Sequence, residues 1–306
     1  MPTGRQGSIR LFNFAGIDVF LHWSWFLVAV YEIQSRSGRY SSVLWNVLEY
    51  LALFVIVLLH EFGHALACRQ VGGRADRIVL WPLGGVAYVD PPPRPGATLW
   101  SIAAGPLVNV CLMPVLAVAV VLTHSQFFLN NWLNFYEPVP SIFWINVGLF
   151  VFNILPVYPL DGGQILRSLL WFVLGRARSL MVAAVFGLLG AAAFIGLALW
   201  WQNLWLGVIA LYMIMNCWGG FKHAQTLLRT AKLPRRAGFA CPTCDNAPPI
   251  GTYWRCSQCR QAFDPFESGA ACPDCRTLYP TTQCLDCGRQ HPIHEWASGS
   301  LVVPHL

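Results

Sequence analysis

The sequence contains few charged residues. Asp, Glu, Lys and Arg make up 11% of its 306 residues, whereas a soluble domain typically has about 25%. Apolar residues account for 56%, and the mean hydropathy is +0.49. This shortage of charge excludes an ordinary soluble domain and favours a protein that crosses a membrane several times. The N-terminal stretch MPTGRQGSIRLFNF lacks a long apolar core that ends in small residues, so we predict no cleaved signal peptide.

Long runs with almost no charge mark the candidate membrane spans, because a bilayer core needs about 20 apolar residues per helix. We predict about six transmembrane helices, one of them broken by Pro156 and Pro159. The runs cover residues 17–33, 47–68, 98–122, 142–174, 180–200 and 203–220. The expected fold is therefore an all-α polytopic membrane protein, to which a short membrane-associated β-hairpin and a small zinc-ribbon domain are added below.

Basic residues are absent from the loop at 123–141, and only Arg36 and Arg39 share its side of the membrane. The opposite side, which includes both termini, has many more: Arg5, Arg10, Arg69, Arg74, Arg77, Arg94, Arg176, Arg178 and the basic run at 222–236. An excess of Lys and Arg marks the cytoplasmic face. We therefore predict a multi-pass protein of the cell membrane with both termini in the cytosol.

Cysteine is scarce before residue 237 and dense after it. Eight of the 11 cysteines lie in four C-x-x-C pairs: Cys241/Cys244, Cys256/Cys259, Cys272/Cys275 and Cys284/Cys287. Four such pairs in so short a segment predict two structural zinc sites, each with four thiolates. A disulfide framework is the alternative, but thiols stay reduced in the predicted cytosolic compartment.

The cysteine-rich segment lacks the basic patch that nucleic-acid-binding proteins show. Residues 238–306 contain four Arg against six acidic residues, a formal charge of −2. We expect no nucleic acid as a partner. Four aromatic residues predicted to be exposed favour a protein partner instead: Tyr253, Trp254, Phe263 and Phe266. The basic run at 222–236 lies beside the last span, and we interpret it as an anchor on anionic lipid.

These features divide the chain into four predicted regions. Residues 1–221 form the membrane domain and residues 222–237 a basic juxtamembrane linker. Residues 238–296 form the double zinc ribbon, and residues 297–306 a tail.

Ionisable residues are rare inside the predicted spans, yet HEFGH occupies residues 60–64. On a helix, His60 and His64 lie on one face and can bind one metal ion. Glu61 is placed to accept a proton from zinc-bound water, as in the zincin motif. The alternative is a chance pattern, but a charged group inside a membrane costs about 2.5–3.5 kcal/mol, so idle residues are not expected here.

A catalytic zinc usually has three protein ligands and one open position. The acidic candidates are few: Glu49, Asp76, Asp90, Glu137 and Asp161. Asp161 follows the broken segment NILPVYPLDGG, late in a span that runs inward, at the depth expected for His60 and His64. The prolines unwind the helix there, and irregular backbone at membrane depth is tolerated where it lines a cavity. We therefore predict Asp161 as the third ligand.

HEFGH on one span and N-x-x-P-x-x-P-L-D-G-G on a later one resemble the site-2 protease family of intramembrane zinc metalloproteases. Three further motifs add to the resemblance, which covers about residues 10–220: PLGG at 82–85, AAGPLVN at 103–109 and HWSW at 22–25. The short loop at 123–141 and the zinc ribbons depart from members that carry PDZ or CBS domains.

The resemblance implies a zinc endopeptidase that hydrolyses peptide bonds in the transmembrane segments of regulatory membrane proteins, near the cytosolic face. It implies one catalytic zinc on His60, His64 and Asp161, with Glu61 as general base. It also implies that Asn153 helps to hold the substrate backbone.

A hairpin is predicted beside this site. Residues 78–90 read as two short β-runs about a Gly84-Gly85 turn, and an exposed edge would pair with an extended substrate by strand addition. An ordinary cytosolic hairpin is the alternative. Asn109 is a candidate substrate-binding residue, and whether His22 lies near the active site stays open.

Two other classes of function compete with a protease. A zinc transporter would need polar residues through the full depth of the membrane, whereas these residues gather near one face. A catalytically inactive membrane adaptor would act only through its zinc ribbons. If the protein is a protease, we expect three zinc ions per chain and cleavage of a substrate. If it is an adaptor, we expect two or three zinc ions and no cleavage.

Overall fold

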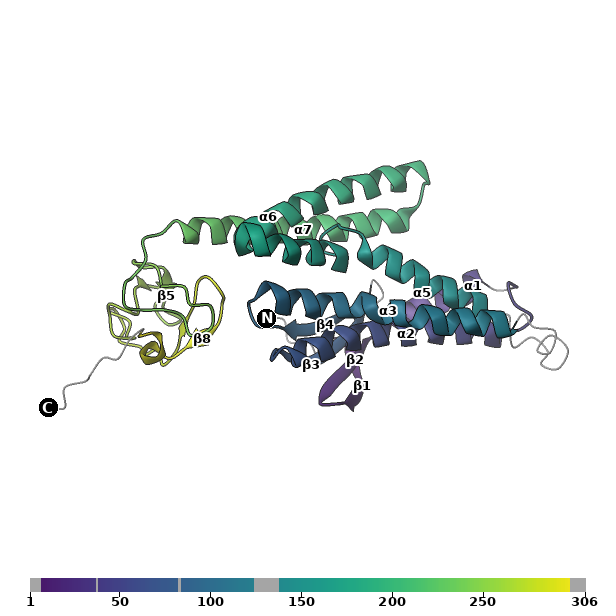
Figure 1. The fold of residues 1–306 in the computed structure, drawn as a ribbon, viewed down its shortest axis with the longest axis horizontal. Helices are drawn as coiled ribbons and strands as arrows, with labels where there is room; N and C mark the ends of the chain where they lie inside the picture. The colour runs from purple at the N-terminus through teal and green to yellow at the C-terminus, as the bar shows by residue number, and fades with distance from the viewer. Residues whose placement is uncertain (1–6, 37, 82–83, 124–137, 298–306) are drawn as a thin grey trace. The chain divides into compact units, whose positions relative to one another are not determined.

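A computed structural model of the chain describes residues 7–36, 38–81, 84–123 and 138–297 (Figure 1). The chain divides into two compact units, Met1–Gly220 and Phe221–Leu306, and each is described here by itself. The predicted loop at 123–141 falls almost entirely outside the described residues.

The described part of the first unit is mostly helical. Its helices are α1 (Ser24–Ser35), α2 (Val43–Gln70), α3 (Pro95–Thr123), α5 (Val139–Ile154), α6 (Asp161–Trp200) and α7 (Leu204–Ala231), the last of which continues into the second unit. Helices α2, α3, α6 and α7 are each long and apolar enough to cross a membrane, and α5 is a shorter apolar helix. Helix α3 packs against α2, α5 and α6, so it is central to the bundle (Figure 1).

The helix boundaries differ from the predicted spans at two places. The run at 17–33 begins with a strand, because a short apolar run does not by itself distinguish strand from helix. The run at 142–174 is two helices rather than one broken span: α5 ends at Ile154 and α6 begins at Asp161. Helix α6 then continues through the fifth predicted span, with a kink at Gly175, whose φ of +76° is a conformation that glycine adopts readily.

A four-stranded sheet lies against α2, and its strands are in sequence order: β1 (Ser8–Phe14), β2 (Ile17–His22), β3 (Arg74–Trp81) and β4 (Gly84–Asp90). The pairs β1–β2 and β3–β4 are antiparallel, and β2–β3 is parallel. The predicted hairpin is confirmed, but Gly84 and Gly85 pair with Trp81 and Leu80 inside the ladder and do not form the turn. Strand β4 is an edge of the sheet.

Alternation along the strands explains why the sheet stays against α2. Ile17 and Val19 of β2 and Ile78 and Leu80 of β3 are fully buried, and they form one core with Phe62 and other residues of α2. Successive side chains of a strand point to opposite faces, so one face of the sheet is apolar. This core fixes the sheet beside the helix that carries HEFGH.

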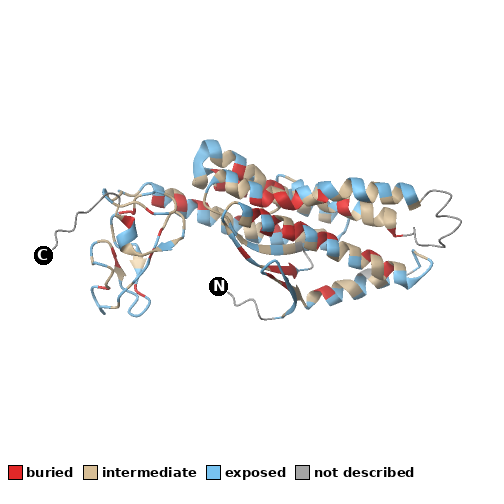
Figure 2. Ribbon diagram, turned by 60° about the horizontal axis from the view of Figure 1, so that its bottom comes forward, coloured by how far each residue is buried: buried red, intermediate tan, exposed pale blue. Residues whose placement is uncertain are grey.

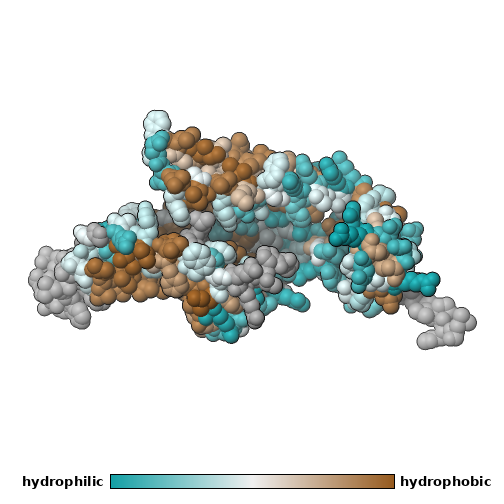
Figure 3. Space-filling view, turned by 180° about the vertical axis from the view of Figure 1, so that it is seen from behind, coloured by the Kyte–Doolittle hydropathy of each residue, from teal (hydrophilic) through white to brown (hydrophobic). Residues whose placement is uncertain are grey.

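Much of the helical surface is apolar and exposed. Buried residues follow the packed faces of the helices and the sheet, whereas long stretches of helix are exposed (Figure 2). Val121, Val173 and Leu204 are 71–84% exposed. On the face shown in Figure 3, hydrophobic side chains gather over the helices. Large exposed apolar surfaces are typical of contact with a membrane, so the bundle is a membrane domain.

The second unit contains two small hairpins, β5–β6 and β7–β8, and a short 3₁₀ helix. Their bounds are β5 (Trp254–Arg255), β6 (Ala262–Phe263), β7 (Thr282–Gln283), β8 (Gln290–His291) and η1 (Ile293–Trp296). Trp296 packs with Cys241 and Cys284, and Phe263 packs with Cys256 and Cys272.

Two arginines at the end of the basic run pair within the ribbon unit. The Arg235 guanidinium donates two hydrogen bonds to the Asp286 carboxylate, at 2.6 and 3.1 Å, and Arg236 pairs with buried Asp264 at 2.7 Å. The bonds to Asp286 raise the pKa of Arg235. Both arginines therefore hold the end of the linker to the ribbon, whereas the predicted contact of the run with anionic lipid stays a prediction.

Candidate metal centre and its cavity

Three predicted ligands converge at one point of the first unit. His60 and His64 lie one turn apart on α2, and Asp161 is the first residue of α6. The two Nε2 atoms are 3.1 Å apart, and Asp161 Oδ2 lies 3.0 Å from His60 Nε2 and 3.4 Å from His64 Nε2. A tetrahedral zinc with bonds of about 2.0–2.1 Å places its ligand atoms about 3.3 Å apart. The spacing therefore fits zinc.

A chain of hydrogen bonds fixes which nitrogen of His60 carries the proton. The Asn146 amide donates to the backbone carbonyl of Asn109 at 2.9 Å, so its Oδ1 accepts from Asn109 Nδ2 at 2.8 Å. The Asn109 Oδ1 consequently faces His60 Nδ1 at 2.6 Å and must accept a hydrogen bond from the Nδ1–H group. The Nε2 atom of neutral His60 then has a free lone pair.

His64 is held in the same way. Its Nδ1 lies 2.9 Å from the backbone carbonyl of Ser101, which can only accept. Both Nε2 lone pairs and one carboxylate oxygen therefore meet without a donor between them, in a site where both histidines are at most 7% exposed. Buried acceptors in this arrangement need a cation, and such outer hydrogen bonds are usual for metal-binding histidines.

Gly105 of α3 leaves the space that an ion would need. A Cβ atom built on Gly105 would clash with the His64 imidazole and lie 2.8 Å from His60 Nε2. Any side chain at this position would enter the volume between the ligands. Gly105 lies in the motif AAGPLVN. The sequence shows the glycine, but only the structure shows that it faces the two histidines.

The backbone before α6 positions Asp161. A Cβ atom on Gly162 would clash with the carbonyl of Ile154, and one on Gly163 would clash with the backbone nitrogen of Tyr158. The two glycines thus allow the segment at 155–160 to fold tightly over the first turn of α6. This explains why glycines follow Asp161 directly.

Glu61 is 6% exposed and lies between α2 and the edge strand β4. Its Oε2 accepts a hydrogen bond of 2.8 Å from the backbone N–H of Ala87. Gly85 of the same strand is so close that an added Cβ would clash with the Glu61 carboxylate. The sheet edge therefore holds this carboxylate beside the metal ligands.

A cavity of about 360 Å³ contains the three predicted metal ligands and Glu61. Its walls come from α2, β4, α3, α5, the segment at 155–160, α6 and α7. Of the predicted substrate-binding residues, Asn153 and Gly85 line it. Four polar lining residues were not singled out by the sequence reading as part of a site: Tyr158, Gln164, Tyr212 and Asn216.

Asn109 and His22 do not line this cavity. Asn109 is fully buried and its side chain bonds to His60 and Asn146, so its prediction as a substrate-binding residue is replaced by a role in positioning His60. His22 stacks on Trp81 with ring centroids 4.0 Å apart, and it does not line the cavity.

The ribbon cysteines form two nested groups. The first and fourth C-x-x-C pairs make one group and the second and third make the other. Facing sulfur atoms lie 3.4–3.7 Å apart, and a tetrahedral zinc with Zn–S bonds of about 2.3 Å spaces its thiolates about 3.8 Å apart. Both groups therefore fit a structural zinc ion.

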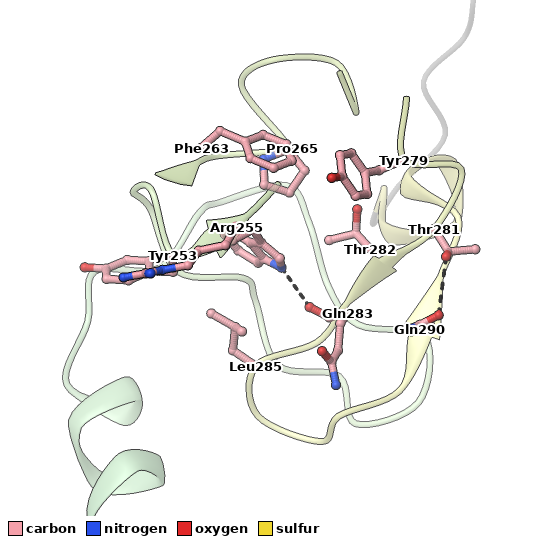
Figure 4. A pocket seen from close by; sticks show the side chains of 11 residues that line it. Tyr253, Arg255, Phe263, Pro265, Tyr279, Thr281, Thr282, Gln283, Leu285 and Gln290 are labelled. Carbon is pink, nitrogen blue, oxygen red and sulfur yellow. Dashed lines mark hydrogen bonds between the residues drawn. The ribbon is translucent and has the colours of Figure 1, made fainter. Parts of the chain in front are cut away.

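A second pocket, of about 330 Å³, lies within the ribbon unit between the two hairpins (Figure 4). The indole N–H of Trp254 donates to the Gln283 carbonyl across it, at 3.0 Å. Of the four aromatic residues predicted to be exposed, Tyr253 is 45% exposed, whereas Phe263 is buried and Trp254 and Phe266 are half-buried. Most of this aromatic surface therefore packs inside the unit.

Comparisons with known proteins agree with this geometry. The sequence model of Peptidase family M50 matches residues 49–133 and 128–198. A zinc metalloprotease of Methanocaldococcus jannaschii is 36% identical over 206 residues, which are 67% of this chain and 58% of that protein. Stage IV sporulation protein FB of Bacillus subtilis is 35% identical over 120 residues, 38% of each chain. The chain thus spans less than two thirds of the length of these curated relatives.

The fold has a counterpart among solved structures. A site-2 protease from Methanocaldococcus jannaschii matches with a TM-score of 0.53 and 33% identity. The match covers 70% of this chain and 95% of that structure.

Proposed function

Since this chain belongs to peptidase family M50, the site-2 protease family, we propose that it is a zinc metalloendopeptidase that cleaves membrane-embedded proteins. The proposal rests above all on the three acceptor atoms of His60, His64 and Asp161 that meet beside Glu61 in one cavity. Neutral or anionic acceptor atoms at this spacing, with no hydrogen-bond donor among them, are stabilised by a bound cation.

The chain's residues divide the chemistry between them. When bound, zinc supplies Lewis-acid chemistry that makes water nucleophilic near neutral pH and polarises a peptide carbonyl. His60, His64 and Asp161 would hold the ion. Glu61 accepts the proton of the attacking water and returns it to the leaving nitrogen. The Ala87 N–H keeps the Glu61 carboxylate in the cavity between these two steps.

The substrate is a transmembrane segment that must be locally unwound, because a helical peptide bond is shielded from water. Strand β4 supports this step, since it is a sheet edge and its residues Gly85 and Ala87 line the cavity. An extended substrate would add to that edge, and Asn153, which also lines the cavity, would hold its backbone. The distribution of Lys and Arg supports cleavage near the cytosolic face.

The remaining proposals concern the cell and the ribbons. We place the protein in the cell membrane with both termini cytosolic, where it would act in regulated intramembrane proteolysis. One catalytic and two structural zinc ions give three per chain. With eight thiolates in two closed groups, the ribbons leave no open coordination position for catalysis, so they recruit or regulate through a protein partner.

A Glu61→Gln variant tests the function. We expect it to abolish cleavage of a transmembrane peptide while zinc content stays at the wild-type level, because Gln keeps the size of Glu but cannot accept the proton. Asp76→Asn is a matched control, since that carboxylate is 82% exposed and outside the cavity. If the wild-type protein binds zinc but cleaves no membrane protein, the inactive adaptor is the better explanation.

A further inference from the structure

An apolar pocket of about 200 Å³ adjoins the catalytic cavity within the first unit. It shares six lining residues with that cavity, among them Asn153, Leu160 and Tyr212. Its own walls are apolar: Trp25 and Val28 of α1, Leu53 of α2, and Trp205, Ile209 and Met213 of α7. The pocket therefore begins beside Asn153 and next to the residue that precedes Asp161.

The volume of the pocket indicates what it can hold. A cavity of about 150 Å³ lined by Leu, Ile and Phe stays dry and binds benzene, so about 200 Å³ accommodates a phenyl ring with its methylene. Met213 is fully buried and Trp25 is 3% exposed, whereas Trp205 is 51% exposed. The wall formed by Met213 and Trp25 is thus buried, and the wall formed by Trp205 reaches the surface.

We propose that this pocket binds one large apolar side chain of the substrate next to the scissile bond. The inference rests on the proposed protease function and adds its substrate preference: Phe, Leu or Met at one position. A lipid acyl chain is the competing occupant. The substrate is the favoured occupant because the pocket shares half of its twelve lining residues with the catalytic cavity, where the scissile bond must lie.

The test measures the kcat/KM of the full-length, zinc-loaded protein on single-span peptides. Each peptide carries Ala around the cleavage point and one Phe, which is moved a position at a time; mass spectrometry locates the cut. One extra methylene in an apolar pocket changes kcat/KM by about 10–200-fold. We therefore expect Phe to exceed Ala by at least about 10-fold at one position only.

Two variants of the pocket should change this preference in opposite directions. Ile209→Trp fills the pocket and should remove the Phe preference while the all-Ala peptide is still cleaved. Met213→Ala enlarges it and should allow Trp in place of Phe. Trp144→Phe, at a side chain that is 66% exposed, is the matched control and should leave the Phe-to-Ala ratio unchanged.

The outcomes separate the two proposals. If the wild-type protein cleaves none of the peptides, both the function and the pocket assignment fail. If it cleaves them but the Phe preference is absent, or survives Ile209→Trp, only the pocket assignment fails. Loss of co-purified lipid in Ile209→Trp with an unchanged peptide preference would assign the pocket to lipid.

Discussion

Gly105 offers the sharpest test of the metal centre, because it touches the ligands without being one. In Gly105→Ala the new Cβ would lie 2.8 Å from His60 Nε2 and closer still to the His64 ring. Contacts between a Cβ and its neighbours ordinarily exceed 3.4 Å. The His60 imidazole would have to move by about 0.6 Å, and that of His64 by more, whereas ligand distances in metal sites hold to about ±0.2 Å.

The expected loss follows from this displacement. A misplacement of about 1 Å in a catalytic constellation lowers the rate by about 100-fold, so we expect at least that loss of cleavage activity in Gly105→Ala. Zinc content, measured by mass spectrometry of the purified protein, should fall from three ions per chain to two, because the ribbon sites are unaffected. Global folding should be retained, since Ala is favoured over Gly in a helix by about 0.8–1.0 kcal/mol.

Gly148→Ala and Gly196→Ala are matched controls for this change. Both glycines are helical, and an added Cβ at either meets nothing within 4 Å. These variants should keep three zinc ions and wild-type activity. A Gly105→Ala protein that also keeps its third zinc and full activity would refute the assignment of the metal to this point.

Three further predictions probe the ligands and the topology. Asp161→Ala should remove one zinc per chain together with activity; an unchanged zinc content would mean that another residue is the third ligand. Asn109→Ala should weaken the catalytic zinc about 10–100-fold in chelator competition, because His60 loses the acceptor that orients it; equal affinity would exclude that role. Reporter fusions in the 72–97 loop and after residue 237 should be cytosolic, and a fusion in 123–141 should not, whereas a cytosolic 123–141 would overturn the span count.

The convergence of His60, His64 and Asp161 could be predicted from the sequence because its signals are local. HEFGH places two ligands by helical spacing alone, and the prolines and glycines around Asp161 mark a break at similar depth. The role of Asn109 could not be predicted in this way. It depends on Asn146, which is 37 residues away in sequence, and only packing of α3 against α5 brings the two amides together.

The sheet and the ribbon show two other limits. Strand β2 merges with α1 into one apolar run, and its pairing with β3 joins residues far apart in the chain, so periodicity missed both. In the ribbon, four equivalent C-x-x-C pairs allow several pairings, and the nested arrangement is decided by tertiary contacts such as those of Trp296 with Cys241 and Cys284.

The helix packing and the chemistry of this protein depend on the same polar network. It runs from Asn146 of α5 through Asn109 of α3 to His60 of α2, and it ends at Asp161 of α6. Every link up to His60 pairs a donor with an acceptor, as burial in an apolar bundle demands. The last contact, between His60 Nε2 and Asp161 Oδ2, joins two acceptors. A cation at this point would supply the missing positive partner. A metal at that point would balance the cost of placing ionisable groups among apolar helices, and it would bind α6 to α2 beside the general base.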